Sequence, residues 1–339
     1  MRHRFIVRAA KIAAGTLVGV TLLCAVATGV GTVLLGWANP PVGRFIDTAS
    51  GKQHVLDVGP DDAAAPPAPP VVLLHGATAN LGDMRVALVE RLRARHRVIA
   101  IDRPGHGWSE RIGGEANAAP RRQAAAAHEI LGKLGVERPV MLAHSWGGAV
   151  GLAYALEYPG ALRGLVLLAP LARPWENELL RYAELANTPW LGALYGHTFA
   201  MPIGLLGLDR ILTLAFAPQA PADNYVEGAS ILLALRPGTF TANAQDLAYM
   251  GAPIAAVVPQ YARIATPTVI ITGTDDHLVS PRSQARPIAR QLPHARLIVL
   301  PGIGHMLHHV EPKRVVDAIE SLAGPDARAG DAPSAGGQP

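Results

Sequence analysis

Cysteine is nearly absent from this sequence of 339 residues, which contains only Cys24. A single cysteine excludes an intrachain disulfide and any metal cluster held by several thiolates. Aromatic residues are also scarce, at 5% of the chain, whereas glycine and proline are plentiful, with 35 and 29 residues. That composition favours many short turns between regular elements. Half of the residues are apolar, so a chain of this length has the material for a large core.

Most of the chain also lacks excess charge of either sign. The formal net charge is +4, but Arg2, Arg4, Arg8 and Lys11 all precede the first acidic residue, Asp47. The remaining 26 basic side chains equal the 26 acidic ones in number. A neutral body gives no electrostatic basis for binding nucleic acid, so we predict no nucleic-acid partner.

A long stretch near the amino terminus contains no charge at all. Residues 12–38 consist mainly of Ala, Val, Leu, Gly and Thr, and they are long enough to cross a bilayer as a helix. We predict a single transmembrane signal-anchor over 12–38, preceded by a basic cytoplasmic segment over 1–11, with the catalytic domain outside the cytoplasm. Cleavage after Ala27 is the alternative, because residues 25–27 have the small–x–small form of a signal-peptide cleavage site. The protein would then be secreted or periplasmic.

Beyond the apolar segment, patterns of short buried strands alternate with helical patterns. Residues 43–47 and 53–58 have the pattern of a β-hairpin around Ser50 and Gly51. The alternation that follows is the signature of βαβ units, so we predict an α/β fold with a mostly parallel sheet flanked by helices. The predicted buried strands are 71–74, 98–101, 140–143, 165–168, 269–272 and 297–300, and the predicted helices lie near 81–94, 121–134, 147–158, 282–291 and 311–322.

One segment interrupts the alternation. Residues 173–262 contain helical stretches broken by Pro and Gly but no buried-strand run. We predict a helical cap over 173–262, inserted into a core formed by 42–172 and 263–323. Some apolar cap residues are expected to line the entrance of a ligand pocket, because such pockets are mostly apolar. Residues 324–339, rich in Ala, Gly and Pro, are predicted to be a disordered tail.

Residues 143–148, Ala-His-Ser-Trp-Gly-Gly, carry the strongest chemical pattern. They follow a predicted buried strand and open a predicted helix, which is the setting of a nucleophile elbow. The tight turn strains the serine backbone and exposes its hydroxyl, and small neighbours let strand and helix approach. Ala143 stands where the usual pattern has its first glycine, and alanine is the mildest replacement. Ser145 is therefore the candidate nucleophile.

An acid and a histidine follow two later strands. Asp276 lies at the carboxyl end of one strand, where ligands bind in open α/β sheets. His305 comes just after the last predicted strand, and its imidazole can take the serine proton and return it to the leaving group. The acid would orient the imidazole and stabilise its protonated form. The chain order Ser145, Asp276, His305 is the order expected for a serine hydrolase of this architecture.

The loop after the first buried strand is a candidate oxyanion hole. It begins at His75, and we predict that the Ala77 N–H points at the developing negative charge, with the Trp146 N–H as second donor. His75, His144 and Met306 adjoin these groups in the sequence and are the candidate substrate-pocket residues.

Five landmarks together resemble the α/β-hydrolase fold superfamily, specifically its capped serine hydrolases: esterases, C–C bond hydrolases and cofactor-free haloperoxidases. The resemblance covers residues 42–323 and implies an α/β-hydrolase fold, an acyl-enzyme mechanism, and no cofactor or metal. The superfamily places its acid at the fourth position of the glycine-led stretch 273–276, which selects Asp276 over Asp275. The landmarks are His75-Gly76, residues 102–109 (Asp-Arg-Pro-Gly-His-Gly-Trp-Ser), the Ser145 elbow, residues 273–276 and Gly304-His305.

Departures from the superfamily patterns narrow the expected reaction. Members that open epoxides or remove halides use an aspartate nucleophile, so Ser145 argues against both reactions. The C–C hydrolases usually carry a further glycine-rich stretch after their first His-Gly and a tryptophan after the catalytic histidine, whereas this chain has Ala-Thr-Ala-Asn over 77–80 and Met306. We therefore predict a serine esterase that acts on a hydrophobic, uncharged ester or similar acyl compound. A C–C bond hydrolase of diketone-like ring-cleavage products and a non-catalytic binding protein are the alternatives.

Three histidines close together raise the question of a metal site. His305 and His309 have the spacing to share a helix face, with His308 beside them, yet no carboxylate accompanies them in a recognisable spacing. We predict no metal site.

Overall fold

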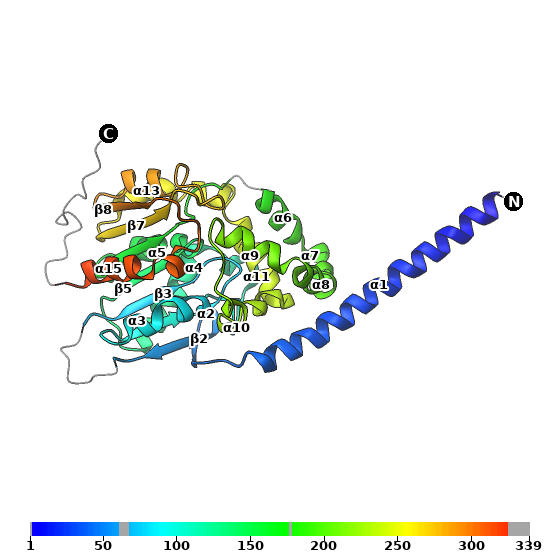
Figure 1. The fold of residues 1–339 in the computed structure, drawn as a ribbon, viewed down its shortest axis with the longest axis horizontal. Coiled ribbons are helices and arrows are strands. Elements are labelled where there is room, and N and C mark those ends of the chain that lie inside the picture. Colours follow the sequence, from blue (N-terminus) through cyan, green and yellow to red (C-terminus); the bar gives the residue numbers. More distant parts are fainter. Residues whose placement is uncertain (1, 61–67, 176–177, 325–339) are drawn as a thin grey trace.

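The computed structural model describes residues 2–60, 68–175 and 178–324. Its centre is an eight-stranded sheet with the order β1-β2-β4-β3-β5-β6-β7-β8. β2 runs antiparallel to β1 and β4, and all later neighbours are parallel, which confirms the predicted hairpin and mostly parallel sheet (Figure 1). The strands are β1 (Arg44–Thr48), β2 (Gly51–Val58), β3 (Val71–Leu74), β4 (Val98–Ile101), β5 (Val140–His144), β6 (Gly164–Leu168), β7 (Thr268–Gly273) and β8 (Ala295–Leu300).

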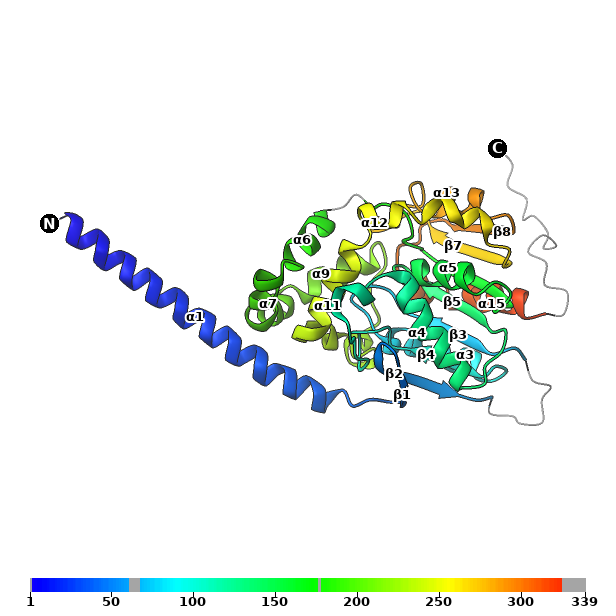
Figure 2. The same ribbon diagram turned by 180° about the vertical axis from the view of Figure 1, so that it is seen from behind.

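Helices cover both faces of this sheet because its central strands are apolar on both sides. Every residue of β3, β5 and β6 is buried, as expected for parallel strands packed on two faces. One apolar core joins the sheet to α4 (Pro120–Lys133), α5 (Gly147–Glu157) and α13 (Ala285–Gln291), in front in Figure 2. The core on the other face, in front in Figure 1, joins it to α2 (Leu81–Met84), α3 (Glu90–Leu92) and α15 (Pro312–Ala323).

Two predicted helices differ from the observed ones. The helix expected over 81–94 ends at Leu92 and contains a π turn, η1 (Arg85–Val89), between α2 and α3. The helix expected from 282 begins only at Ala285. Before that residue, the Gln284 side chain accepts hydrogen bonds from the backbone of Ala172 and Arg173. Sequence periodicity does not report such a long-range bond.

Between β6 and β7 the chain leaves the sheet and builds a helical layer at one end of it (Figure 1). The segment predicted as a cap, 173–262, falls within this excursion. Its helix α11 (Pro237–Ala248) reaches the predicted nucleophile elbow, where Trp146 Nε1 donates to the Asp246 carbonyl oxygen at 2.8 Å. The layer contains α6 (Glu178–Ala186), α7 (Pro189–Thr198), α8 (Ala200–Leu206), α9 (Leu208–Phe216), α10 (Tyr225–Gly228), η3 (Ile231–Leu235), α11 (Pro237–Ala248), α12 (Ala252–Ala255) and η4 (Val258–Arg263). Two further short helices are η2 (Gly114–Asn117) and α14 (Leu307–Val310).

The amino-terminal helix α1 (Arg2–Ala38) projects from the body and is the longest element in Figure 1. It begins at Arg2 rather than at residue 12, because the basic residues that precede the apolar run are helical too. Its 37 residues rise about 55 Å at 1.5 Å per residue, and the helix is long and apolar enough to cross a membrane. Its topology and its possible cleavage stay predictions. The tail was predicted over 324–339, and its residues from 325 onward lie outside the described part of the chain.

Candidate active site

Ser145 occupies the turn between β5 and α5, with φ at +51°, a conformation that side chains rarely adopt. Its N–H donates to the Leu168 carbonyl oxygen at 2.8 Å, which ties the turn to the end of β6. A Cβ at Gly147 would lie 2.6 Å from the His75 carbonyl oxygen, so only glycine fits there. Ala143, which replaces the usual first glycine, is fully buried in the core. The local geometry is therefore that of a nucleophile elbow.

Asp276 and His305 meet at the carboxyl ends of β7 and β8. His305 Nδ1 lies 2.7 Å from Asp276 Oδ2, and both side chains are buried. Asp276 Oδ1 accepts the N–H groups of Leu278 and Val279 at 3.0 and 2.8 Å. The neighbouring Asp275 instead accepts the hydroxyl of Thr274. Of the two adjacent acids, only Asp276 contacts the histidine, and both of its carboxylate oxygens make hydrogen bonds.

The loop of His305 lies against the elbow. His144 Nε2 donates to the His305 carbonyl oxygen at 3.2 Å, and the two ring centroids are 4.8 Å apart. His144 directly precedes Ser145. The three residues predicted as a triad are therefore gathered at one edge of the sheet, from β5, β7 and β8.

The predicted oxyanion loop also packs against the elbow. A Cβ at Gly76 would lie 3.0 Å from Ser145 Cβ, so the loop backbone touches the serine. Within the described part of the chain, no acceptor takes the N–H of Ala77 or of Trp146. The next residue, Thr78, has φ at +55° and donates its N–H to Asn243 Oδ1 at 2.7 Å, which fixes the loop to α11. Two free N–H groups beside Ser145 are what an oxyanion hole requires.

Residues 69–312 match the family model described as alpha/beta hydrolase fold. The chain belongs to this family. Among curated proteins, this α/β-hydrolase is 25% identical over 288 residues to haloalkane dehalogenase 2 of Mycobacterium tuberculosis, covering 81% of this chain and 93% of the relative. It is also 24% identical over 259 residues to an sn-1-specific diacylglycerol lipase of Mus musculus, covering 75% and 80% of the two chains.

Solved structures show the same fold. An esterase from Exiguobacterium antarcticum superposes with a TM-score of 0.67 at 20% identity, covering 83% of this chain and 99% of the esterase. A meta-cleavage product hydrolase from Pseudomonas fluorescens superposes with a TM-score of 0.65 at 19% identity, covering 84% and 98%. At these identities the likeness concerns the fold alone.

Arg103 belongs to the landmark 102–109 and is buried in this α/β-hydrolase, with distant partners that the sequence pattern did not reveal. Its guanidinium donates to the carbonyl oxygens of His75 and Gly76 at 3.0 and 2.8 Å. It also donates to Gln123 at 2.9 Å and to the fully buried carboxylate of Asp246, on cap helix α11, at 2.5 Å. Arg103 therefore joins the predicted oxyanion loop to the cap, across 143 residues of sequence.

Of the predicted pocket residues, His75 is fully buried, with both ring nitrogens bonded. Nδ1 lies 2.8 Å from the Gly76 carbonyl oxygen, and Nε2 accepts the Arg103 N–H at 3.0 Å. Burial, reinforced by the Arg103 charge, lowers the pKa of His75 well below its ordinary value. Met306 is buried in an apolar cluster with the cap residues Phe216 and Tyr225. Their positions support the loop and the cap, and a direct role in holding substrate stays a prediction.

A carboxylate does accompany the clustered histidines, contrary to expectation. Asp83, in α2, is completely buried and accepts bonds from His308 Nε2 at 3.0 Å and His309 Nε2 at 2.7 Å. The Tyr225 hydroxyl donates to the same carboxylate at 3.1 Å. Burial opposes ionisation of Asp83, but the two histidines outweigh it and hold its pKa well below the usual range. The sequence did not suggest this contact because 225 residues separate Asp83 from His308.

These three side chains have the ligand types of a metal site, but their surroundings do not suit one. The expected shared helix face is also wrong, because α14 begins at Leu307 and leaves His305 outside. A histidine that binds a metal through Nε2 carries its proton on Nδ1 and normally donates it to an acceptor. His308 Nδ1 is buried and has no partner among the described residues. The cluster is better explained as a buried carboxylate satisfied by three donors.

Proposed function

We propose that this α/β-hydrolase is a membrane-anchored serine esterase that cleaves apolar carboxylic esters. The observation that carries the proposal is the 2.7 Å contact between Asp276 Oδ2 and His305 Nδ1, beside a serine at φ +51°. With Nδ1 held by the carboxylate, the imidazole presents Nε2 as its basic atom. A positioned base near a serine hydroxyl is the arrangement that activates a nucleophile.

In this mechanism the Ser145 oxygen attacks the ester carbonyl carbon while His305 Nε2 takes the hydroxyl proton. The carbonyl oxygen becomes negatively charged and accepts the N–H groups of Ala77 and Trp146, each such donor contributing about 3 kcal/mol to transition-state stabilisation. Collapse of the tetrahedral intermediate breaks the ester C–O bond, and His305 returns its proton to the departing alcohol. A water molecule, deprotonated by the same histidine, then hydrolyses the acyl-enzyme and regenerates Ser145.

The hydroxyl nucleophile favours acyl transfer over halide displacement. A carboxylate that displaces a halide forms an ester, which water then cleaves. A serine oxygen in the same reaction would form an ether, which water does not cleave at neutral pH, so the enzyme would not be regenerated. The relative named as a diacylglycerol lipase adds support for an ester substrate. The apolar cap residues favour an uncharged, hydrophobic acyl group.

Membrane anchoring is supported by α1. The helix is apolar over most of its length, and its four basic residues all lie in the first eleven positions. Basic residues on one flank favour retention of that flank in the cytoplasm, which would place the catalytic domain on the other side of the membrane.

The test is hydrolysis of p-nitrophenyl butyrate by the full chain in detergent micelles, beside Ser145→Ala and a matched control, Ser283→Ala, at an exposed serine. We expect Ser145→Ala to lose hydrolysis by a factor of about 10⁶ and to lose labelling by a fluorophosphonate probe, whereas Ser283→Ala keeps both. Hydrolysis that persists in Ser145→Ala would exclude Ser145 as nucleophile. Labelling without hydrolysis of any ester chain length would favour the C–C hydrolase alternative.

A further inference from the structure

Exposed apolar side chains are concentrated on one part of the cap. Outside α1, ten large apolar side chains of the described residues are exposed, and seven of them lie on α7, α8 and α9. Leu206 is 90% exposed and Trp190 73% exposed. Residues 189–216 contain only two charged residues, Asp209 and Arg210. Exposed apolar side chains gathered on neighbouring helices mark an interaction site in a soluble domain. The seven are Trp190, Leu194, Ile203, Leu205, Leu206, Ile211 and Leu214.

Two of the helices that carry these side chains, α7 and α8, contact α1. The Thr28 hydroxyl of α1 donates to the carbonyl oxygen of Thr198, the last residue of α7, at 2.7 Å, and Thr28 is almost completely buried. One turn further along α1, Gly31 lies against the Met201 side chain of α8. The end of the helix is tied to the body as well, since Trp108 Nε1 donates to the Asn39 carbonyl oxygen at 3.0 Å. The cap helices therefore lie at a defined level along α1.

That level can be compared with the thickness of a bilayer. Lys11 is the last basic residue of α1, and a hydrocarbon layer of about 30 Å takes about 20 residues of helix. Counted from Ile12, the layer ends near Gly31, so the contacts of Thr28 and Gly31 with the cap lie at its outer edge. With the bilayer placed in this way, the exposed side chains of α7–α9 lie level with its outer surface.

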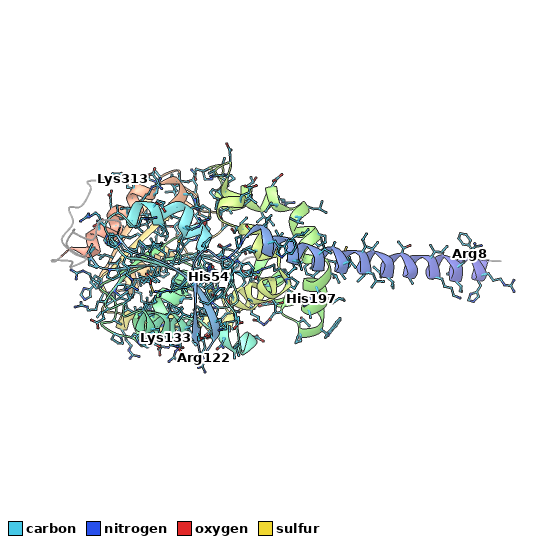
Figure 3. All side chains as sticks on the ribbon, turned by 90° about the horizontal axis from the view of Figure 1, so that it is seen from below. Arg8, His54, Arg122, Lys133, His197 and Lys313 are labelled. Atoms are coloured by element: carbon cyan, nitrogen blue, oxygen red, sulfur yellow. The ribbon has the colours of Figure 1, made fainter. Side chains whose placement is uncertain are left out.

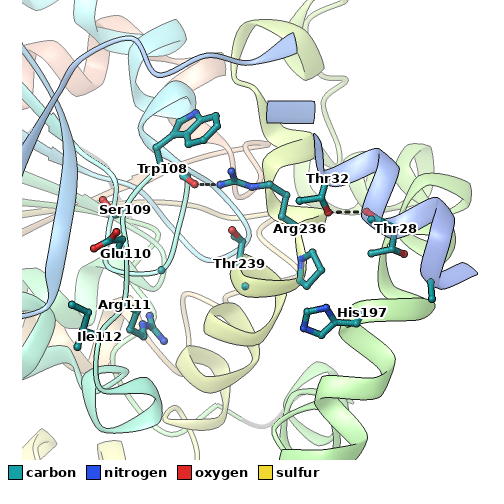
Figure 4. Close-up of a pocket in the computed structure, with 16 residues that line it drawn as sticks. Thr28, Thr32, Trp108, Ser109, Glu110, Arg111, Ile112, His197, Arg236 and Thr239 are labelled. Carbon is teal, nitrogen blue, oxygen red and sulfur yellow. Dashed lines mark hydrogen bonds between the residues drawn. The ribbon is translucent and has the colours of Figure 1, made fainter. Parts of the chain in front are cut away.

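The side chains just above this level suit the headgroup region. Gly36 of α1 contacts Trp108, about 8 Å further along the helix than Gly31. The Arg236 guanidinium stacks on the Trp108 ring at 4.6 Å and donates to the Gly107 carbonyl oxygen. Both residues line a cavity of about 940 Å³ between α1 and the body (Figure 4). Tryptophan and arginine at this depth are typical of membrane–water interfaces.

We propose that the exposed apolar face of α7–α9 is immersed in the outer interfacial layer of the bilayer that α1 spans. The cap of the enzyme then rests on the lipid, and the opposite end of the body, which carries Lys313, stays in water (Figure 3). This inference rests on the proposed membrane anchoring but not on ester hydrolysis. Burial of large apolar side chains away from water is favourable, so seven of them form a second attachment to the membrane.

The test is depth-dependent fluorescence quenching of the full chain in phosphatidylcholine vesicles. In a Cys24→Ala background, single cysteines are introduced by Leu206→Cys and, as matched control, Lys313→Cys, and each is labelled with the fluorophore NBD. Both sites are exposed, so neither substitution disturbs the core. The unaltered protein labelled at Cys24 reports the position of α1. Lipids that carry a nitroxide near the headgroup or deep in the acyl chain serve as quenchers.

We expect strong loss of NBD fluorescence at Leu206→Cys with the shallow nitroxide and none at Lys313→Cys. An unquenched label at Leu206→Cys together with a quenched label at Cys24 would overturn the proposal while leaving the anchor intact. Absence of quenching at both Cys24 and Leu206→Cys would overturn the proposal and the anchor together. Hydrolysis of p-nitrophenyl butyrate, measured on the same samples, separates either failure from a failure of the proposed esterase activity.

Discussion

Three buried histidines make the folded protein sensitive to acid. His75, His106 and His144 are all almost completely buried. Burial lowers the pKa of each well below its ordinary value, assisted by the charge of Arg103 at His75 and His106 and by His308 at His144. The folded state therefore keeps these imidazoles neutral at pH values where the unfolded chain protonates them. Because the unfolded state binds more protons, the free energy of unfolding falls as the pH drops below about 6.5.

The size of the effect follows from the same linkage. Between pH 7.5 and 5.5, a histidine with an unfolded pKa of about 6.5 that stays neutral when folded costs about 1.4 kcal/mol of stability. Three such residues cost about 4 kcal/mol, a large part of the 5–15 kcal/mol typical of a domain. Above about pH 7.5 the loss disappears, since both states are then neutral.

The assay is urea unfolding of the full chain in detergent micelles at pH 7.5 and 5.5, followed by tryptophan fluorescence. We expect His106→Gln to reduce the difference between the two pH values by about 1.4 kcal/mol. His197→Gln, at an exposed histidine, should leave that difference unchanged. Equal free energies of unfolding at both pH values in the unaltered protein would refute the reasoning, because they would mean that the buried imidazoles are protonated in the folded state or exposed to water.

Three further substitutions test the site. Ser145→Gly and Ser145→Ala should both abolish hydrolysis, but the glycine variant should be about 1 kcal/mol more stable, because φ at +51° strains any side chain; thermal midpoints would measure the difference. Asp83→Ala should lower the free energy of unfolding by about 3 kcal/mol or more, because it leaves three donors without an acceptor; an unchanged urea midpoint would contradict this. Arg103→Lys should lower kcat by about 10²-fold with little change in KM, because it loosens the Gly76 carbonyl behind the predicted oxyanion hole. A rise in KM with kcat unchanged would argue against a role for this arginine in positioning the loop.

Local patterns were enough to predict the elements that position the site. Continuous apolar runs such as 71–74 and 140–143 specify strands buried on two faces, because only a sheet covered on both sides can use them. The small residues around Ser145 predicted the tight turn, because strand and helix approach too closely there for a larger side chain. Ser145, Asp276 and His305 each follow a predicted strand of the parallel sheet. The alternation of strands and helices therefore already implied that they would lie at the same end of the sheet. Their catalytic roles stay predictions.

The tertiary structure alone decided which distant side chains meet. The contact of Arg103 with Asp246 and that of Asp83 with His308 span 143 and 225 residues, and neither pair shares a motif. Sequence periods of 2 and 3.6 report which face of an element is buried, but not which partner covers that face. The same limit applies to α1. Its composition indicates a membrane helix, whereas its contact with the cap through Thr28 depends on packing between segments that no sequence period connects.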